Sequence, residues 1–356
     1  MFTNEICPEC RVPRYITREH LWLDSGVIVQ KGNPSHRLTI IDTLNLDPLY
    51  QDISDLIGVP IERIVTETAR RTTRAYMDKM LAPEMKEAAC NSQEGLMGLV
   101  EVSFQIGRLL GCGNPRLKEL RVDGSADDHV TIEVIEPYPA PLYFGNFAGT
   151  AEVVLGQESG VTYRETSASI FEATVFRSEH PEEVRERLVA RPYTYEAGSV
   201  EMEKCGTCGG PAGLSDYIWD IESGIIKTRA SGQRVAMLGP EMLDPIFTEL
   251  ENELGEAIPH LVIEAQRRYI RSRTFVLEGL DREESARIEL ALRGIGDLRE
   301  FELSGRSLRI RLENAGLHLL MIGQMQGLFE LYSQADSRVL WELSDNSTLD
   351  IEIEAI

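Results

Sequence analysis

Apolar residues recur along this chain with two different spacings. Within residues 59–77 they fall three or four positions apart, which predicts an amphipathic helix. Its apolar face carries Ile61, Ile64, Val65, Ala69 and Tyr76. Residues 129–134 (HVTIEV) and 307–313 (SLRIRLE) instead alternate apolar with polar positions, which predicts strands with one buried face.

Proline and glycine mark the ends of a further predicted helix at residues 44–58. We expect Asp47 as its N-cap, Pro48 at its first helical position and Gly58 as its C-terminal stop. Residues 96–111 are more continuously apolar and predict a more buried helix.

A helix of small residues is predicted at 145–156, and Gly156 ends it. Two strand patterns follow at 160–165 and 169–176, and a similar pair closes the chain at 338–343 and 348–356. We therefore expect an α+β fold in which a few helices pack against antiparallel sheets.

The chain repeats itself, beginning with its two Cys-x-x-Cys motifs, which lie 198 positions apart (205 − 7 = 198). Further matches follow in order at offsets of 197 or 198: Trp22 with Trp219, Ser25–Gly26 with Ser223–Gly224, Gly58 with Gly255, and Arg70–Arg71 with Arg267–Arg268. Later matches keep an offset of 177 or 178: Gly145 with Gly323, Gly149 with Gly327, Glu152 with Glu330, and Glu165 with Glu342. One shortening of 19 residues (197 − 178 = 19) around residues 82–93 accounts for the change.

A duplication predicts two domains of the same type. We place the first half at residues 1–178, a linker with a short charged helix at 179–204, and the second, shorter half at 205–356. Each half begins with a Cys-x-x-Cys knuckle. We expect the two halves to pair about a pseudo-twofold axis as an internal pseudo-dimer.

The two knuckles are candidate metal ligands. Pairing of the halves would bring Cys7 and Cys10 together with Cys205 and Cys208 and form one site of four thiolates. Zinc is the default ion for such ligands, and iron in a rubredoxin-type site would use the same four. Two separate sites completed by other ligands, or two pairs that are vestigial or redox-active, are the alternatives.

Other candidate metal and haem ligands have weaker support. Cys90 and Cys112 have no counterparts in the second half, so we interpret them as single buried thiols. The six histidines do not correspond between the halves, so a haem ligand among them is disfavoured.

The composition narrows the class of partner. A net charge of −22 disfavours binding to nucleic acid or to an anionic membrane surface. The sequence shows neither a secretion signal nor a stretch of 18 apolar residues, and Cys-x-x-Cys pairs without such a signal suit a reducing cytoplasm. We therefore expect a cytoplasmic protein.

Residues 144–176 resemble the closing part of the 4-vinyl reductase domain family. That family shows a helix of the form G-x-x-A-G-x-x-E-x-x-x-G and then a strand ending in Glu-Thr. The matching residues here are Gly145, Ala148, Gly149, Glu152, Gly156, Glu165 and Thr166. The resemblance covers about residues 40–176 and, more faintly, 238–355. Ser167 and Ser344 stand where the family's phenol sensors have their first zinc-binding cysteine, and no cysteine follows.

The resemblance implies a domain of the superfamily that contains haem-based nitric-oxide sensors and Golgi transport-particle subunits. Many members bind small molecules, so we expect a small apolar or aromatic ligand and a separate effector protein. The candidate ligand-binding residues are Trp22, Tyr143, Phe144 and Phe147, which lie near a knuckle or on the glycine-rich helix. The first half keeps the family pattern better.

Three functions are consistent with these observations. The first is a non-enzymatic sensor or binding protein with a structural zinc site shared by the two halves. The second is a reductase-like enzyme or accessory protein that handles a tetrapyrrole or other cofactor, although the sequence carries no phosphate-binding loop, dinucleotide fingerprint or nucleophile elbow. The third is a structural adaptor without a ligand.

Overall fold

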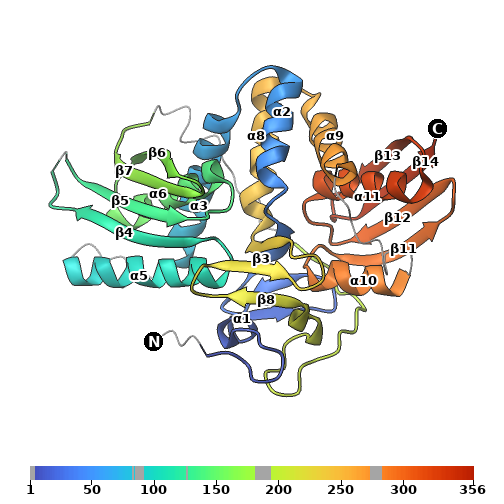
Figure 1. Ribbon diagram of the computed structural model, residues 1–356, viewed down its shortest axis with the longest axis horizontal. Coiled ribbons are helices and arrows are strands. Elements are labelled where there is room, and N and C mark those ends of the chain that lie inside the picture. Colours follow the sequence, from blue (N-terminus) through green and yellow to red (C-terminus); the bar gives the residue numbers. More distant parts are fainter. Residues whose placement is uncertain (1–4, 82–83, 85–91, 126, 181–193, 273–282) are drawn as a thin grey trace. The chain divides into compact units, whose positions relative to one another are not determined.

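The computed structural model describes the chain except for residues 1–4, 82–83, 85–91, 126, 181–193 and 273–282. The described residues form nine α-helices and three antiparallel sheets, so the predicted α+β class is confirmed (Figure 1). The chain divides into two compact units. Unit 1 comprises Met1–Asn4, Ile61–Arg191 and Trp219–Ile226, and unit 2 comprises Glu5–Pro60, Pro192–Ile218 and Lys227–Ile356.

A six-stranded sheet follows the two knuckles, in the strand order β1-β2-β3-β10-β9-β8. Its central strands β3 and β10 are antiparallel, with Ile41 opposite Ala236. Helix α1 (Arg14–Glu19) precedes β1, and a 3-10 helix (Ala212–Asp216) precedes β8. The strands are β1 (His20–Trp22), β2 (Ile28–Gln30), β3 (Asn33–Asp42), β8 (Tyr217–Asp220), β9 (Ile225–Thr228) and β10 (Arg234–Leu238).

Unit 1 contains a four-stranded sheet in the order β4-β5-β7-β6 and the helices that pack on it. Buried Ile132 and Val134 on β5 pack against Phe144 on α6, as their alternation predicts. Its elements are α3 (Glu62–Met80), α5 (Gln93–Leu109), β4 (Asn114–Arg121), β5 (His129–Ile135), α6 (Ala140–Leu155), β6 (Ser159–Ser167) and β7 (Ile170–Arg177).

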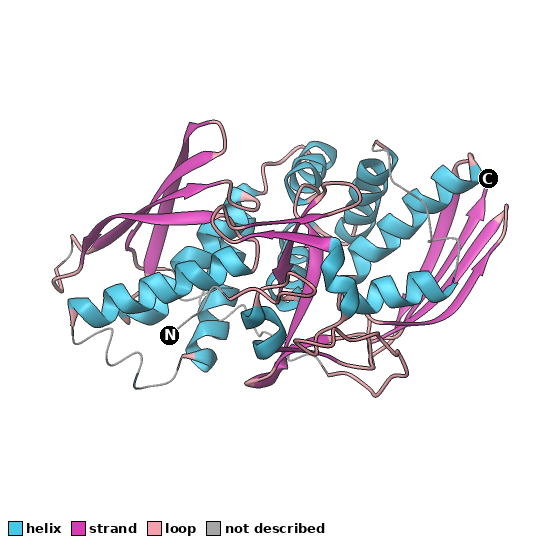
Figure 2. Cartoon of the chain, turned by 60° about the horizontal axis from the view of Figure 1, so that its bottom comes forward, coloured by secondary structure: helices cyan, strands magenta, loops and turns pink. Residues whose placement is uncertain are grey.

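Unit 2 contains a second four-stranded sheet, in the order β11-β12-β14-β13. The helices of each four-stranded sheet lie on one of its faces (Figures 1 and 2). The elements of this part of unit 2 are α2 (Leu46–Ile57), α8 (Pro240–Leu254), α9 (Ile258–Arg271), α10 (Glu283–Leu292), β11 (Asp297–Leu303), β12 (Ser307–Glu313), α11 (His318–Ser333), β13 (Ser337–Leu343) and β14 (Leu349–Ala355).

Glycines allow the glycine-rich helix to approach its neighbour closely in both units. A Cβ added at Gly149 would lie 2.2 Å from the carbonyl oxygen of Arg70 on α3. A Cβ added at Gly323 on α11 would lie 2.4 Å from the carbonyl oxygen of Ile263 on α9. Neither helix pair could pack this closely if these positions carried a side chain.

Most predicted elements are confirmed, but the starts of two helices are wrong. Helix α6 begins at Ala140, five residues before the predicted start at residue 145. Helix α2 begins at Leu46 and its N-cap is Asn45, so Asp47 lies inside the first turn rather than at the cap. Gly58 ends the helix in the left-handed region (φ 72°), as expected. The short charged helix of the linker and most of residues 82–93 lie outside the described residues.

The bounds of the two units differ from those of the sequence halves because residues 5–60 belong to unit 2. The halves at 1–178 and 205–356 therefore stay a prediction about the repeat. No helix among the described residues is long and apolar enough to cross a membrane.

Candidate metal centre and apolar cavity

The two knuckles fold in the same way. In the first, the backbone N–H of Cys7 donates to Val12 (2.9 Å) and that of Arg11 donates to Cys7 (3.0 Å). In the second, the N–H of Cys205 donates to Gly210 (2.8 Å) and that of Gly209 donates to Cys205 (2.9 Å). The four bonds correspond at an offset of 198, so the backbone turn that presents each cysteine pair is repeated.

The knuckles bring all four predicted cysteines together within unit 2. The Sγ atoms of Cys7 and Cys205 are 3.8 Å apart, those of Cys10 and Cys208 are 3.5 Å apart, and all four lie within 4.8 Å of one another. Tetrahedral binding with zinc–sulfur bonds of about 2.3 Å places sulfurs about 3.8 Å apart. The cluster therefore has the ligand types and spacing to hold a metal ion.

Backbone amides favour the charged form of the first thiol. Burial raises the pKa of Cys7, but N–H groups of Cys10 and Glu9 that donate to its sulfur lower that pKa to about 7. Burial raises the pKa of Cys10, and the neighbouring sulfur of Cys208 adds to this increase. Since a metal binds the thiolate, amides that donate to sulfur favour ligation at Cys7.

Glu9 links the two knuckles directly, and sequence reasoning missed it. Its carboxylate accepts hydrogen bonds from the backbone N–H of Gly206 (3.2 Å) and the hydroxyl of Thr207 (2.6 Å). These bonds lower the pKa of the Glu9 carboxyl group, the Thr207 hydroxyl contributing most. The signal was present in the sequence, because Glu9 and Thr207 are at matched positions of the two motifs.

An arginine–glutamate pair with a buried carboxylate also recurs at the repeat offsets. In unit 1, the Nη1 atom of Arg70 lies 2.6 Å from Glu152, whose carboxylate also accepts from the N–H of Ser159 (2.8 Å). In unit 2, Nη1 of Arg267 lies 2.6 Å from Glu330, which accepts from the N–H of Ser337 (3.0 Å). The glutamates thus join α6 to β6 and α11 to β13, which gives them a structural role.

The predicted aromatic residues of the first half fill a core. Phe144 is fully buried and stacks on Tyr163 with ring centroids 4.6 Å apart. Tyr143 and Phe147 pack on the same cluster. Trp22 belongs to the other unit, where its indole N–H donates to the carbonyl of Leu292 (2.9 Å). A ligand-binding role for these four residues stays a prediction.

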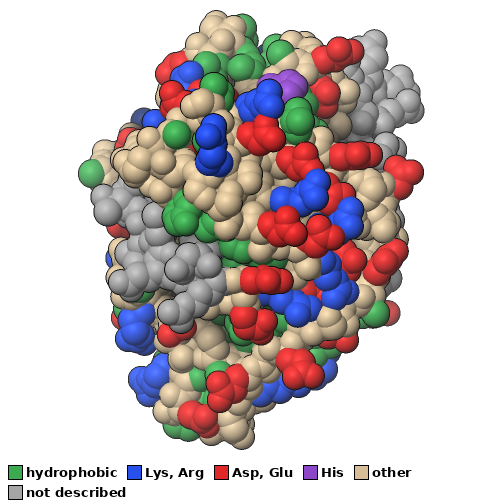
Figure 3. All heavy atoms as spheres, turned by 90° about the vertical axis from the view of Figure 1, so that its right-hand side faces the viewer, with side chains coloured by type: hydrophobic (Ala, Val, Ile, Leu, Met, Phe, Trp, Pro, Cys, Tyr) green, Lys and Arg blue, Asp and Glu red, His purple; other side chains and the backbone are tan. Residues whose placement is uncertain are grey.

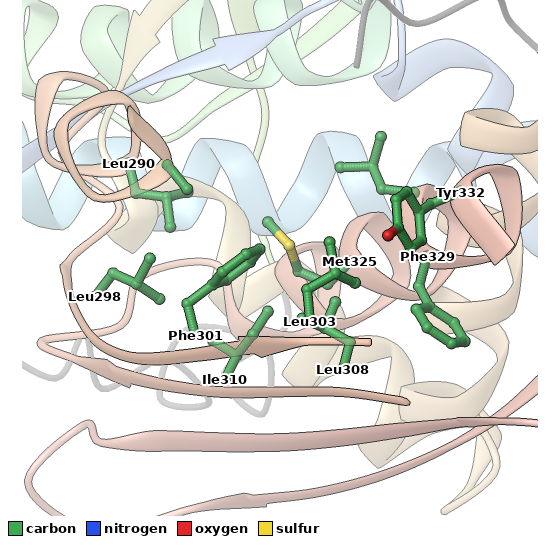
Figure 4. Close-up of a pocket in the computed structure, with 11 residues that line it drawn as sticks. Leu290, Leu298, Phe301, Leu303, Leu308, Ile310, Met325, Phe329 and Tyr332 are labelled. Carbon is green, nitrogen blue, oxygen red and sulfur yellow. The ribbon is translucent and has the colours of Figure 1, made fainter. Parts of the chain in front are cut away.

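An apolar cavity of about 60 Å³ lies in unit 2, between α10, α11 and strands β11 and β12. Figure 4 shows Leu290, Phe301 and Met325 pointing toward one another around it. Among the described residues that line it, Tyr332 alone carries a hydroxyl. The full lining is Ala286, Leu290, Leu298, Phe301, Leu303, Leu308, Ile310, Met325, Leu328, Phe329 and Tyr332.

The sequence contained only an indirect signal for this cavity. Met325 lies at the repeat position of Phe147 (325 − 147 = 178), so a flexible thioether stands where the first half has a ring. Composition alone could not show whether the core around Met325 is repacked or contains a cavity.

Comparison with known proteins gives distant structural matches only. No family model matches the chain, and no curated protein matches it. The phenol-responsive sensory domain of the transcription activator PoxR, solved with phenol, is 14% identical with a TM-score of 0.33, covering 47% of this chain and 89% of that one. A Cs H-NOX mutant is 13% identical (TM-score 0.26, 35% and 77% covered), and a mutant of T. Tengcongensis H-NOX is 14% identical (TM-score 0.24, 33% and 74% covered). All three TM-scores lie below 0.5, so the likeness is remote.

Proposed function

We propose that this chain is a duplicated small-molecule-binding protein whose two halves are joined by one structural zinc ion. The observation that carries the proposal is the combination, within unit 2, of a clustered four-thiol site and a separate apolar cavity. Among the described residues, the cavity lining offers hydrophobic contact and one phenol hydroxyl, that of Tyr332, with no carboxylate, imidazole or amine beside it. Ligand binding without catalysis is therefore the function that fits it.

The order of the six-stranded sheet supports the duplication. The strand order is the same from either edge when β1, β2 and β3 are exchanged for β8, β9 and β10. A pseudo-twofold axis between β3 and β10 would relate the two sets and would also exchange the two knuckles. We propose that the halves meet in this sheet as an internal pseudo-dimer.

The four thiols would hold zinc as a closed structural site. Each half supplies two ligands, so the ion would cross-link chain segments that are 198 residues apart. A structural zinc stabilises such a fold by on the order of 10 kcal/mol. Iron would suit the same four sulfurs, and metal analysis separates the two.

The cavity limits the ligand to a small one. An engineered cavity that binds benzene has a volume of roughly 150 Å³, so a single ring enters this cavity of about 60 Å³ only if lining side chains move. A tetrapyrrole is much larger, so the cavity does not support the reductase-like alternative. We propose a small apolar or aromatic ligand, with the Tyr332 hydroxyl available to one polar substituent, and a separate protein that responds to ligand binding.

Native mass spectrometry combined with metal analysis tests the zinc, and thermal unfolding with benzene, toluene and phenol tests the cavity. We expect one zinc per chain and a stabilisation of about 2.7 kcal/mol at 100 times the dissociation constant of a bound probe. Met325→Phe should fill the cavity and abolish that stabilisation while metal content is unchanged. Absence of metal after reconstitution would reject the zinc site, and a probe that stabilises both proteins equally would reject the cavity.

A further inference from the structure

Strand β13 lies at the edge of its sheet and carries an exposed apolar side chain at its centre. Leu340 is 65% exposed, and β14 is the only neighbour of β13 among the described residues. Edge strands of soluble proteins usually protect themselves with charge, proline or a bulge, because a free apolar edge invites another strand. β13 has no proline and pairs with β14 without a bulge, and its charges, Arg338 and Glu342, lie on either side of Leu340.

The backbone of β13 has groups available for such pairing. The N–H of Ser344 donates to Thr348 (2.9 Å) and the N–H of Ile356 donates to Asp336 (2.9 Å). Since hydrogen-bonded pairs alternate along an antiparallel ladder, Arg338, Leu340 and Glu342 also bond toward β14. The N–H and C=O groups of Val339, Trp341 and Leu343 therefore point toward the free edge.

The side chains of β13 are self-complementary about its centre. Arg338, Leu340 and Glu342 share the outer face of the sheet, where acidic and basic side chains alternate (Figure 3). Within its own sheet Arg338 donates to the carboxylate of Glu354 on β14 (3.0 Å). If two β13 strands pair antiparallel about Leu340, Leu340 faces its own copy and Arg338 also faces Glu342 of the second copy. These are non-hydrogen-bonded positions, at which cross-strand side chains approach most closely.

The same register satisfies the outward backbone groups. Val339 of one strand lies opposite Trp341 of the other, so the two residues exchange both N–H···O=C bonds. Ser337 takes no part, because its N–H donates to the Glu330 carboxylate and its carbonyl accepts from Gln326. The pairing thus covers the middle of the strand.

The matched edge of the other four-stranded sheet lacks these features. On β6, Thr162 lies opposite Thr174, as Leu340 lies opposite Glu352 (both at an offset of 178). Thr162 therefore occupies the position of Leu340. By the strand register, Gly160 and Arg164 occupy the positions of Arg338 and Glu342, so the match of Glu165 with Glu342 expected from the sequence is wrong by one residue. An antiparallel pair of β6 strands therefore has no charge complement.

We propose that the free edge of β13 is a homodimer interface, where β13 of one chain pairs antiparallel with β13 of a second copy about an axis at Leu340. The two sheets then form one continuous sheet. A standard protein–protein interface buries about 1,200–2,000 Å² of accessible surface, and a single strand pair buries less. We therefore expect a reversible dimer with a dissociation constant between about 1 μM and about 1 mM.

Sedimentation velocity of the metal-loaded full chain from about 1 μM to about 1 mM measures this equilibrium. We expect the wild type to dimerise, and Leu340→Asp to raise the dissociation constant at least about tenfold because two carboxylates then meet at the axis. Thr162→Asp, the matched change on β6, should leave the equilibrium unchanged. A wild type that stays monomeric throughout, or a dimer that Leu340→Asp does not weaken, would overturn the proposal.

Charge exchange tests the register. Arg338→Glu and Glu342→Arg each place like charges opposite one another in a homodimer, so each variant alone should be monomeric. When the two variants are mixed, opposite charges meet at both positions. The carboxylate introduced by Arg338→Glu faces the guanidinium introduced by Glu342→Arg. The unchanged Glu342 of the Arg338→Glu variant faces the unchanged Arg338 of the Glu342→Arg variant. A heterodimer should therefore form. Native mass spectrometry distinguishes the species by mass, and failure of the mixture to associate while both variants keep wild-type melting would exclude this register.

Discussion

The two four-stranded sheets have the same order of elements but different interiors. Over β4–β7, the rings of Phe144, Tyr163 and Phe171 pack together with Phe104 and close the core. Over β11–β14, leucines, Met325 and two phenylalanines leave a cavity of about 60 Å³. A shared backbone arrangement therefore does not determine whether a core is filled, because that depends on side-chain volume at a few facing positions.

The difference bears on where a ligand would bind. The sequence analysis placed the expected ligand site in the first half, and that site stays a prediction. The apolar cavity lies in the second half, where Ile322 and Met325 stand at the repeat positions of Phe144 and Phe147 (both at an offset of 178).

The two halves match best at the knuckles. Single cysteine substitutions test whether the two knuckles contribute equally to metal binding. Cys10→Ser and Cys208→Ser should each release the metal and destabilise the fold by up to about 10 kcal/mol, because each removes one of four ligands. Metal content and thermal unfolding measure this effect. Cys112→Ser, which changes a buried cysteine outside the cluster, is the control and should keep its metal. Loss in one knuckle variant only would show that the halves do not share one site.

Opening the filled core should be the next largest effect. Phe144→Ala removes a fully buried ring and should cost about 3–5 kcal/mol of unfolding free energy. Chemical denaturation measures the loss. If the interiors differ mainly in side-chain volume, this variant should also gain stabilisation from benzene. A loss below about 1 kcal/mol would show that the first core is not close-packed.

Acid should affect the first half of the six-stranded sheet more than the second. Burial lowers the pKa of His20 to about 4, whereas Tyr217, at the matched first position of β8, does not titrate in acid. The unfolded state binds a proton at His20 below about pH 6.5, so stability is present above that pH and is lost as the pH falls toward 4.

His20→Gln should remove about 2–3 kcal/mol of this pH dependence. Unfolding free energies of wild type and variant between pH 4 and pH 7 measure the difference. Parallel pH profiles would show that His20 does not carry the dependence.

The smallest effect is expected from the reciprocal core change. Phe147→Met copies the residue of the hollow core into the filled one and should cost about 1.5 kcal/mol or less, since the thioether adapts to irregular space. Thermal unfolding measures it. A greater loss would show that Phe147 has a more specific packing role than its partial burial indicates.

Much of the fold was predictable because its signals are local. The alternation in residues 129–134 and 307–313 predicted β5 and β12, and Gly58 and Gly156 end α2 and α6 in the left-handed region as expected. The cap at Asp47 was wrong because Asn45 already precedes the first helical turn.

The sites were predictable to different degrees. The clustering of the four cysteines could be predicted because the repeat offset relates the two pairs. The cavity could not, since it is a difference in volume among eleven side chains from four elements. The Glu9 bridge needed the knuckles to be placed side by side before its hydrogen bonds to Gly206 and Thr207 could be recognised.

The separation between the knuckles has a consequence during synthesis. A ribosome that adds about 5–20 residues per second needs roughly 10–40 seconds to pass from the first cysteine pair to the second. If the four thiols bind one ion, Cys7 and Cys10 have only half of their ligand set throughout that interval. They must then stay reduced until Cys205 and Cys208 have been synthesised.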